Sequence, residues 1–347
     1  MLIRDILEES EKKFSEIKAV KWLKKKEICD RSYRELMENA KSVRKGLCEE
    51  SFQGKHIALI GSSSVEWIEA YLGIITGQAV AVPLDAGLPV EDLIDLLNRS
   101  DAEALFLSPK IQTLSERILE ECPKLKKIWI LQEEKIETNQ KKVASVAELM
   151  TSGINGTDDF AAPDPEDIAT IIFTSGTTGK SKGVMLTQRN LAENVKSVNY
   201  TAEPGTIVLS VLPIHHAFCL VMDWLKGFSF GATVCINDSL MHMVKNMGVF
   251  HPDIMLMVPL MVETIYKRLS AMNPLMCKEN MQAAKALMEN RFGPLDVKAV
   301  LYSHSHVDHF GGAEGAIDRN DVADPSLSID KQLASGKTVI LAPEGFL

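Results

Sequence analysis

The chain has 347 residues, of which 46% are hydrophobic, so it can form one large domain or two smaller ones with a real core. Its 47 acidic and 38 basic residues give a formal net charge of -9 without a basic stripe, so the sequence predicts no nucleic-acid partner. A charged N-terminus, the lack of a long uninterrupted apolar run and six scattered cysteines predict a cytoplasmic protein with reduced thiols and no transmembrane segment.

The first part of the chain alternates between helical and strand-like patterns. Apolar residues at helical spacing predict a helix over 2–17, and Ser32 with Glu35 has capping-box spacing before a second helix. This alternation predicts an α/β fold, with a parallel sheet covered by helices on both faces. Further strands are expected at 56–61, 79–84, 104–108 and 127–131, with helices at 64–77, 89–100 and 111–122.

The most informative stretch follows a polar connector over 132–167. Residues 168–173 read as a buried strand, and 174–183 as the flexible loop after it. Glycines there allow close backbone approach, and hydroxyl groups with exposed amides can surround phosphate oxygens while a lysine supplies charge. The predicted nucleotide triphosphate site comprises Thr174, Ser175, Gly176, Thr177, Thr178, Gly179, Lys180 and Lys182.

The spacing of the glycines distinguishes this loop from a Walker P-loop. A Walker loop needs four residues between its first glycine and Gly-Lys-Ser/Thr, and only Thr177 and Thr178 stand there. Residues 173–184 instead resemble the phosphate loop of the adenylate-forming superfamily, Tyr/Phe-Thr-Ser-Gly-Thr-Thr-Gly-x-Pro-Lys-Gly-Val, with Ser181 in the proline place. Ala-Tyr-Leu-Gly-Ile at 70–74 and Val-Pro-Leu-Asp at 82–85 are also similar to segments of that superfamily.

This resemblance covers residues 1–272 and implies the α/β fold of the large N-terminal domain of adenylate-forming enzymes, with parallel or mixed sheets layered with helices. It implies that a small-molecule carboxylic acid, as in long-chain fatty acid-CoA ligases, attacks the α-phosphate of ATP. The expected products are an acyl-adenylate and pyrophosphate, followed by a thioester with coenzyme A as co-substrate. Mg²⁺ is the implied metal at the phosphates.

A predicted strand at 207–212 runs into Pro-Ile-His-His at 213–216. In the adenylate-forming superfamily this strand ends in Pro-Leu-x-His, which implies that His216 flanks the carboxylate pocket as the catalytic candidate. Spacing alone favours a histidine whose hydrogen bonds are satisfied at a strand end, and the phosphate loop upstream favours the pocket residue instead. Further strands at 232–237 and 253–259 and helices at 242–249 and 261–272 extend the α/β pattern.

From Asn273 onward the sequence changes in character. A strand over 296–303 leads into three imidazoles and a carboxylate, which can aim at one or two metal ions. Their His-x-His-x-Asp-His pattern resembles the metallo-β-lactamase superfamily, and segments at 283–287 and 343–346 resemble its alkylsulfatase branch. The alternative is that Gly-Gly-Ala at 311–313 is a strand end of an adenylating enzyme. The implied Zn²⁺ ligands are His304, His306, Asp308 and His309.

The two resemblances predict an AMP-binding region over 1–272 joined to a metallo-β-lactamase-like fragment over 273–347. Neither is accompanied by the later motifs of its family, such as the Tyr-Gly-x-Thr-Glu stretch or the lid lysine of the adenylating enzymes. We therefore expect a carboxylate-activating enzyme impaired by truncation. The alternatives are a metal-dependent hydrolase of sulfate esters and a catalytically inactive hybrid. The strand over 296–303 is expected to extend the sheet of the first region.

Overall fold

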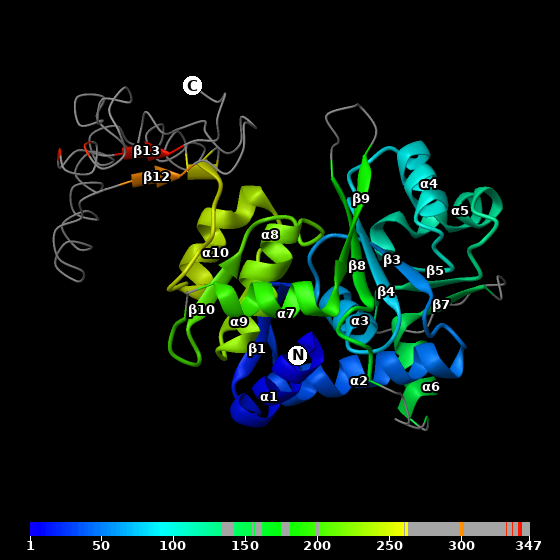
Figure 1. Cartoon of the computed structure of the whole chain (residues 1–347), viewed down its shortest axis with the longest axis horizontal. Coiled ribbons are helices and arrows are strands. Elements are labelled where there is room, and N and C mark those ends of the chain that lie inside the picture. Colours follow the sequence, from blue (N-terminus) through cyan, green and yellow to red (C-terminus); the bar gives the residue numbers. More distant parts are fainter. Residues whose placement is uncertain are drawn as a thin grey trace. The chain divides into compact units, whose positions relative to one another are not determined.

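The structure is a computed structural model of the whole chain, and Figure 1 shows its elements. The chain divides into two compact units, Met1–Leu256 and Met257–Leu347. The residues that the structure describes are 1–132, 142–154, 156, 162–174, 181–198, 201–259, 261–262, 299–301, 331, 335 and 339–341.

The first unit contains a seven-stranded sheet with the order β7-β6-β5-β3-β4-β8-β9. All neighbouring strands are parallel except β8 and β9, which form an antiparallel hairpin at one edge. The predicted parallel sheet is thus confirmed as a mixed one. Its strands are β3 (His56–Ile60), β4 (Val80–Leu84), β5 (Ala104–Leu107), β6 (Lys127–Ile130), β7 (Val143–Ser145), β8 (Ile168–Thr174) and β9 (Lys182–Thr187).

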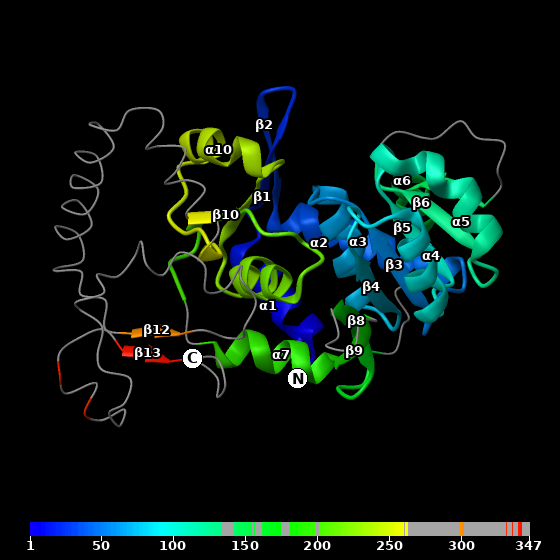
Figure 2. The ribbon, with the colours of Figure 1, turned by 90° about the horizontal axis from the view of Figure 1, so that it is seen from above.

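Helices cover both faces of this sheet (Figure 2). On one face Leu97 of α4 and Ile118 of α5 join a buried cluster with Val82 and Leu105 of the strands. On the other face α3 and α6 contact the strands, and α2 packs on both of these helices. Side chains alternate between the faces along each strand, so near-continuous apolar runs bury both sides. The helices are α2 (Tyr33–Glu49), α3 (Val65–Ile75), α4 (Val90–Arg99), α5 (Ser115–Glu121) and α6 (Val146–Ile154).

A second sheet of the first unit joins the N-terminus to residues about two hundred positions later. Its order is β10-β11-β1-β2, with β1 (Lys18–Lys24), β2 (Glu27–Ser32), β10 (Ile207–Ser210) and β11 (Thr233–Ile236). The Tyr33 hydroxyl donates to the Ala232 carbonyl oxygen at 2.7 Å, which ties α2 to this sheet. The β1–β2 hairpin, which extends from the sheet in Figure 2, turns through Lys25 and Lys26, both with positive φ.

Short helices surround the second sheet. They are α1 (Ile3–Phe14), α7 (Gln188–Ser197), α8 (Ala217–Cys219), the π-helix η2 (Leu220–Leu225), α9 (Lys226–Ser229), η3 (Leu240–His242) and α10 (Met243–Phe250). The 3-10 helix η1 (Pro109–Leu114) precedes α5 in the part expected as one helix over 111–122.

Three local expectations are corrected. The strand expected at 253–259 is wrong, because only Ile254 forms a bridge, to Val208, while the Asp253 carboxylate accepts from the Ile207 amide at 2.9 Å. The polar connector contains β7 and α6. The loop expected over 174–183 is shorter, because Thr174 and 182–183 are already strand residues. The capping box of Ser32 and Glu35 is confirmed.

The second unit has one described sheet, in which β12 (Ala299–Leu301) and β13 (Val339–Leu341) are parallel. β12 lies within the predicted strand over 296–303, but it pairs with β13 rather than extending the larger sheets. Of the helix expected over 261–272, only 261–262 lie within the described residues. No helix in the described parts of the chain is long and apolar enough to cross a membrane.

Candidate functional site

The carboxyl ends of β3, β4 and β8 meet at one edge of the seven-stranded sheet. Gly61 follows β3, Asp85 follows β4, and Thr174 is the last residue of β8. In open α/β sheets, ligands bind in the crevice outside the carboxyl ends of the parallel strands. We therefore take this edge as the candidate site.

The β8–β9 hairpin brings two predicted phosphate-binding residues together. Thr174 and Lys182 are register partners, and both side chains are exposed. Six residues, 175–180, connect Thr174 to Ser181, which precedes β9. The other members of the predicted site, Ser175, Gly176, Thr177, Thr178, Gly179 and Lys180, lie outside the described residues.

One side chain from α4 contacts both arms of this hairpin. The guanidinium carbon of Arg99 lies 5.6 Å from the centroid of the Phe173 ring on β8. Its Nη2 donates to the Ser181 carbonyl oxygen at 2.5 Å. Phe173 is the register partner of Gly183, where an added Cβ would lie 3.4 Å from Phe173 Cε1. Arg99 therefore links the end of β8 to the residue before β9.

The predicted catalytic residue His216 lies after β10. It is exposed and caps α8, where its Nδ1 accepts from the Phe218 amide at 3.2 Å. The neighbouring His215 is half-buried, and its Nε2 lies 3.9 Å from Asp85 Oδ2. This contact brings the segment after β10 to the carboxyl end of β4.

Burial lowers the pKa of His215, with Asp85 raising it and His216 lowering it as smaller effects. Burial disfavours the imidazolium because the charged form loses solvation. At neutral pH, His215 therefore stands beside Asp85 as a neutral imidazole, able to donate or accept a hydrogen bond.

A buried polar cluster lies directly behind the segment that carries these histidines. Cys219 Sγ is 3.4 Å from Ser210 Oγ and donates to the Leu212 carbonyl oxygen at 3.3 Å. Asp223 Oδ2, at 3.6 Å from Cys219 Sγ, is the alternative acceptor for the same thiol proton. Burial raises the pKa of Asp223 to about 7, against hydrogen bonds from Ser210 and Cys219 that lower it. The cluster links the end of β10 to the π-helix η2.

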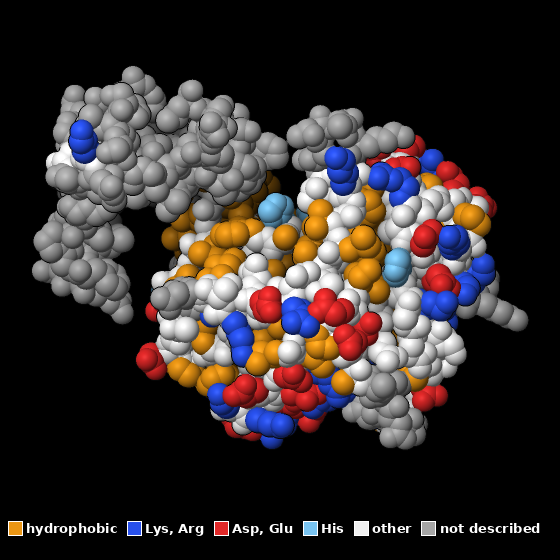
Figure 3. Space-filling view, viewed as in Figure 1, with side chains coloured by type: hydrophobic (Ala, Val, Ile, Leu, Met, Phe, Trp, Pro, Cys, Tyr) orange, Lys and Arg blue, Asp and Glu red, His pale blue; other side chains and the backbone are white. Residues whose placement is uncertain are grey.

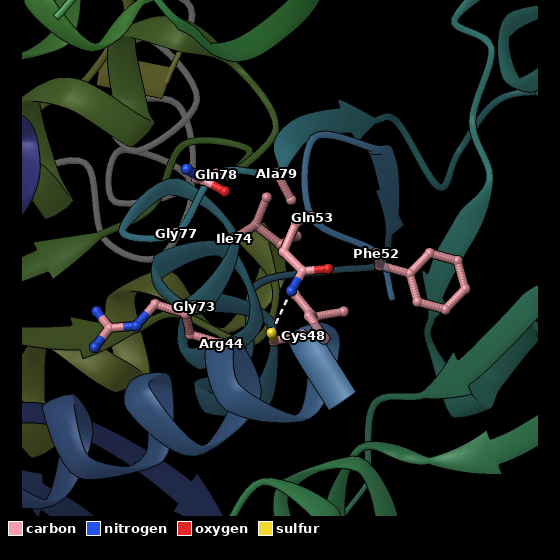
Figure 4. Close-up of a pocket in the computed structure, with 10 residues that line it drawn as sticks. Arg44, Cys48, Phe52, Gln53, Gly73, Ile74, Gly77, Gln78 and Ala79 are labelled. Carbon is pink, nitrogen blue, oxygen red and sulfur yellow. Dashed lines mark hydrogen bonds between the residues drawn. The ribbon is translucent and has the colours of Figure 1, made fainter. Parts of the chain in front are cut away.

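A small pocket lies at the opposite edge of the seven-stranded sheet (Figure 4). Gln53 and Ala79, which precede β3 and β4, line it together with Arg44 and Cys48 from α2. The Gln53 amide donates to Cys48 Sγ. Because it lies at the amino ends of the strands and includes none of the predicted site residues, we do not assign it to the candidate site.

The predicted zinc ligands His304, His306, Asp308 and His309 lie outside the described residues. Within the part of the chain that the structure describes, no group of three or more His, Cys, Asp or Glu side chains could hold a metal ion. The described cysteines are free thiols, as predicted, namely Cys29, Cys48, Cys122, Cys219 and Cys235.

On the face drawn in Figure 3, charged side chains of both signs are interspersed over α1 and α2, whereas apolar side chains gather over the α8–α10 region. Exposed apolar residues in the sequence from α8 to α10 include Phe218, Leu240 and Val244.

Solved structures show the class of fold. The chain superposes on the adenylation domain of a carboxylate reductase from Mycobacterium chelonae with a TM-score of 0.71 and 18% identity, covering 84% of this chain and 52% of that one. It superposes on an anthranilate CoA ligase in complex with anthranoyl-AMP with a TM-score of 0.67 and 20% identity, covering 75% and 50%. The chain thus has the α/β fold found in adenylating enzymes.

The sequence profile of the family described as AMP-binding enzyme matches residues 7–314, so the chain belongs to that family. The match includes the hairpin and His216, and it continues past the predicted boundary at 272 through Gly-Gly-Ala at 311–313.

The chain is similar to only part of each curated relative. Long chain acyl-CoA synthetase 7 of Arabidopsis thaliana is 28% identical over 222 residues, which are 62% of this chain and 32% of that protein. Long-chain-fatty-acid–CoA ligase 5 of Mus musculus is 27% identical over 263 residues, 72% and 38%. The chain therefore spans about a third of the length of these relatives.

Sequence reasoning missed three residues that the structure brings to the site. Asp85 was part of a recognised segment but had no role, and His215 was overlooked beside His216. Arg99 carries no sequence signal, because nothing at the end of a helix predicts contact with a hairpin over seventy residues later.

Proposed function

We propose that this chain binds Mg-ATP at the β8–β9 hairpin and uses it to activate a long-chain carboxylic acid for transfer to coenzyme A. The observation that carries the proposal is the position of the hydroxyl- and glycine-rich segment. It joins two strands at the edge where the carboxyl ends of β3, β4 and β8 meet. Membership in the AMP-binding enzyme family supports the nucleotide.

Residues 174–182 would hold the β- and γ-phosphates. Backbone amides and hydroxyl groups would donate hydrogen bonds to phosphate oxygens, and Lys180 or Lys182 would add a positive charge. Thr174 and Lys182 are exposed at the loop end of the hairpin, where both side chains are accessible to such an anion.

The donor set at this edge also suits Mg²⁺. In nucleotide sites this ion takes only one or two protein ligands beside phosphate oxygens and water. The exposed Thr174 hydroxyl and the part-exposed Asp85 carboxylate are ligands of the required oxygen type. When bound, the ion would neutralise charge on the phosphates.

His216 would border the acid. The proposed reaction begins with attack of a carboxylate oxygen on the α-phosphorus, breaking the bond to the β-phosphate and releasing pyrophosphate. The thiolate of coenzyme A then attacks the acyl carbonyl and releases AMP. Such displacements depend mainly on positioning and on charge neutralisation. The protein's part in this scheme is to hold the polyphosphate and the carboxylate in line.

The names of the relatives support a long-chain acid as the substrate class, since the mouse and Arabidopsis proteins are named as long-chain acyl-CoA synthetases or ligases. The apolar side chains exposed near His216, such as Phe218, suit the alkyl chain of an acid better than they suit a second charged group on it.

Thermal unfolding of the full chain with millimolar Mg-ATP tests nucleotide binding. A ligand at one hundred times its dissociation constant stabilises the folded state by about 2.7 kcal/mol. We therefore expect the melting temperature to rise by about 3–5 °C. Lys180→Ala combined with Lys182→Ala should remove most of this rise while leaving the ligand-free melting temperature unchanged.

A control ligand and an activity assay extend the experiment. An equal rise with inorganic triphosphate would indicate an anion site without nucleotide recognition, and no rise with Mg-ATP would contradict the proposal. ATP–pyrophosphate exchange with palmitate and with benzoate then tests activation. Exchange that depends on palmitate supports the long-chain class, and exchange only with benzoate refutes it.

A second candidate function rests on the His-x-His-x-Asp-His pattern at 304–309. Four ligand-type side chains in this register are suited to zinc, and a zinc-bound water can hydrolyse a sulfate ester. We propose zinc binding by His304, His306, Asp308 and His309 as the alternative to acyl activation, with a catalytically inactive hybrid as the remaining case.

A further inference from the structure

Arg99 is the last residue of α4. Its side chain contacts Phe173 near the end of β8 and Ser181 just before β9, the residues on either side of the connection 175–180. Phe173 is one residue before the last residue of β8, and Ser181 is the residue before β9.

The chemistry of arginine suits these two contacts. Its planar guanidinium can stack on an aromatic face while its N–H groups donate in a fixed fork. Here the group lies over the Phe173 ring and donates to the Ser181 carbonyl oxygen. Asp95, one turn earlier on α4, accepts from Arg99 Nη1 at 3.1 Å and orients the side chain.

The Phe173 ring also packs against the neighbouring strand β9. The ring lies beside Gly183, and an added Cβ at that glycine would also come within 3.1 Å of Ile171 Cγ2. An aromatic ring over a cross-strand glycine fills the space that a side chain would occupy. The ring therefore lies beside the glycine of β9 and within cation–π distance of the guanidinium of α4.

We propose that Arg99 is a positioning residue, which fixes Phe173 at the end of β8 and Ser181 before β9 relative to each other, at the base of the proposed polyphosphate site. The inference rests on the proposed function, because it assigns Arg99 a role in binding the β- and γ-phosphates. The inference predicts that loss of Arg99 weakens the binding of ligands with β- and γ-phosphates more than the binding of ligands without them.

The experiment measures binding of Mg-ATP and of AMP to the full chain by calorimetry. Arg99→Ala should weaken Mg-ATP binding about tenfold, since a charge-assisted hydrogen bond and a cation–π contact are lost. AMP, which lacks the β- and γ-phosphates, should bind within twofold of wild type. Arg99→Lys keeps the charge but loses the planar fork, so it should behave like Arg99→Ala.

The matched control is Arg117→Ala. Arg117 lies on α5, is exposed to a similar extent as Arg99, and pairs with Glu91 and Glu121 without touching the hairpin. This variant should bind Mg-ATP like wild type. If Arg99→Ala does not fold, Arg99→Lys and Asp95→Asn carry the same test, because both keep a polar side chain at an exposed site.

Hydrogen exchange separates failure of the inference from failure of the proposed function. In Arg99→Ala the amides of Phe173 and Val184 should exchange faster, whereas those of β5 and β6 should not change. Wild-type protein without Mg-ATP binding would refute the proposed function and with it the role of Arg99. Wild-type binding with equal losses of Mg-ATP and AMP, or with no loss, would refute the inference alone.

Discussion

Asp223 is the residue whose environment departs furthest from that of an ordinary carboxylate. It is fully buried, and its pKa is raised from 3.8 to about 7 because burial disfavours the charged form. Its recorded neighbours are Cys219 and Ser210, neither of which carries a positive charge. At neutral pH this carboxyl group is therefore partly protonated inside the protein.

The raised pKa makes stability depend on pH. Between about pH 4 and pH 7 the folded state keeps a proton that the unfolded state has released, so stability falls as the pH rises and levels off above pH 7. From pH 5 to pH 8, wild-type protein should lose about 2–3 kcal/mol relative to Asp223→Asn. Urea unfolding of both proteins at pH 5, 6.5 and 8 measures this difference.

The comparison between the two proteins cancels groups that titrate in both. Parallel stability profiles would show that Asp223 ionises in the folded state at its ordinary pKa. A control on Asp238 is informative because its pKa is lowered and its side chain is exposed by about half, so Asp238→Asn should not flatten the profile.

At the scale of residues, sequence patterns predict chemistry that is local in the chain. The hydroxyl and glycine residues of 174–182 are adjacent, so their spacing alone predicts a phosphate loop. The approach of His215 to Asp85 spans 130 positions and depends on how two sheets pack, which no local pattern contains. Whether His216 borders an acyl pocket stays a prediction.

Helices α2 and α6 approach each other closely where they cross. An added Cβ at Gly46 of α2 would lie 2.3 Å from the Leu149 carbonyl oxygen, and one at Gly153 of α6 would lie 2.1 Å from that of Ser42. Both obstacles are backbone atoms, which cannot move aside as a flexible side chain can. The crossing therefore requires glycine on both helices.

Alanine substitutions test this crossing. Gly153→Ala should destabilise the protein by about 2–3 kcal/mol, since an added methyl group in a closely packed contact forces the helices apart. Gly248→Ala on α10, where nothing lies within 4 Å of the added Cβ, should instead stabilise it by about 0.5–1 kcal/mol. Urea midpoints measure both, and a similar effect of the two changes would contradict the packing argument.

The elements that sequence reasoning predicted well are those with strong apolar runs and recognisable ends. The strand expected at 168–173 is β8, and the helix expected at 89–100 is α4. The β1–β2 hairpin was missed because its turn is Lys25-Lys26. Two-residue hairpin turns with positive φ at both positions favour Asn-Gly, and lysines give no such signal. The lysines along β1 also break the alternation expected of a strand.

At the scale of the whole molecule, the family match and the predicted hybrid organisation make different claims about the end of the chain. The match runs to residue 314, which includes the predicted zinc ligands. The boundary at 272, the metallo-β-lactamase-like fragment and the cytoplasmic location stay predictions. The described part of the second unit contributes one parallel strand pair, β12 and β13.

Metal analysis of the full chain decides between these claims. If residues 304–309 form a zinc site, protein purified without chelator should contain at least one zinc ion per chain, and His304→Ala with His309→Ala should reduce that content severalfold. His251→Ala, at the end of α10, is the control and should leave it unchanged. Zinc well below one per chain in wild type, or equal in all variants, would remove the hydrolase alternative.

The antiparallel reversal between β8 and β9 has a consequence for how this family can vary. Thr174 and Lys182 are register partners in the antiparallel pair of β8 and β9. The pairing of these strands therefore does not depend on the number of residues that connect Thr174 to Lys182. Closing a segment twice as long costs only about 0.6 kcal/mol. Insertions and deletions here would therefore be screened by selection on ligand recognition, while selection on folding acts on the strands beneath.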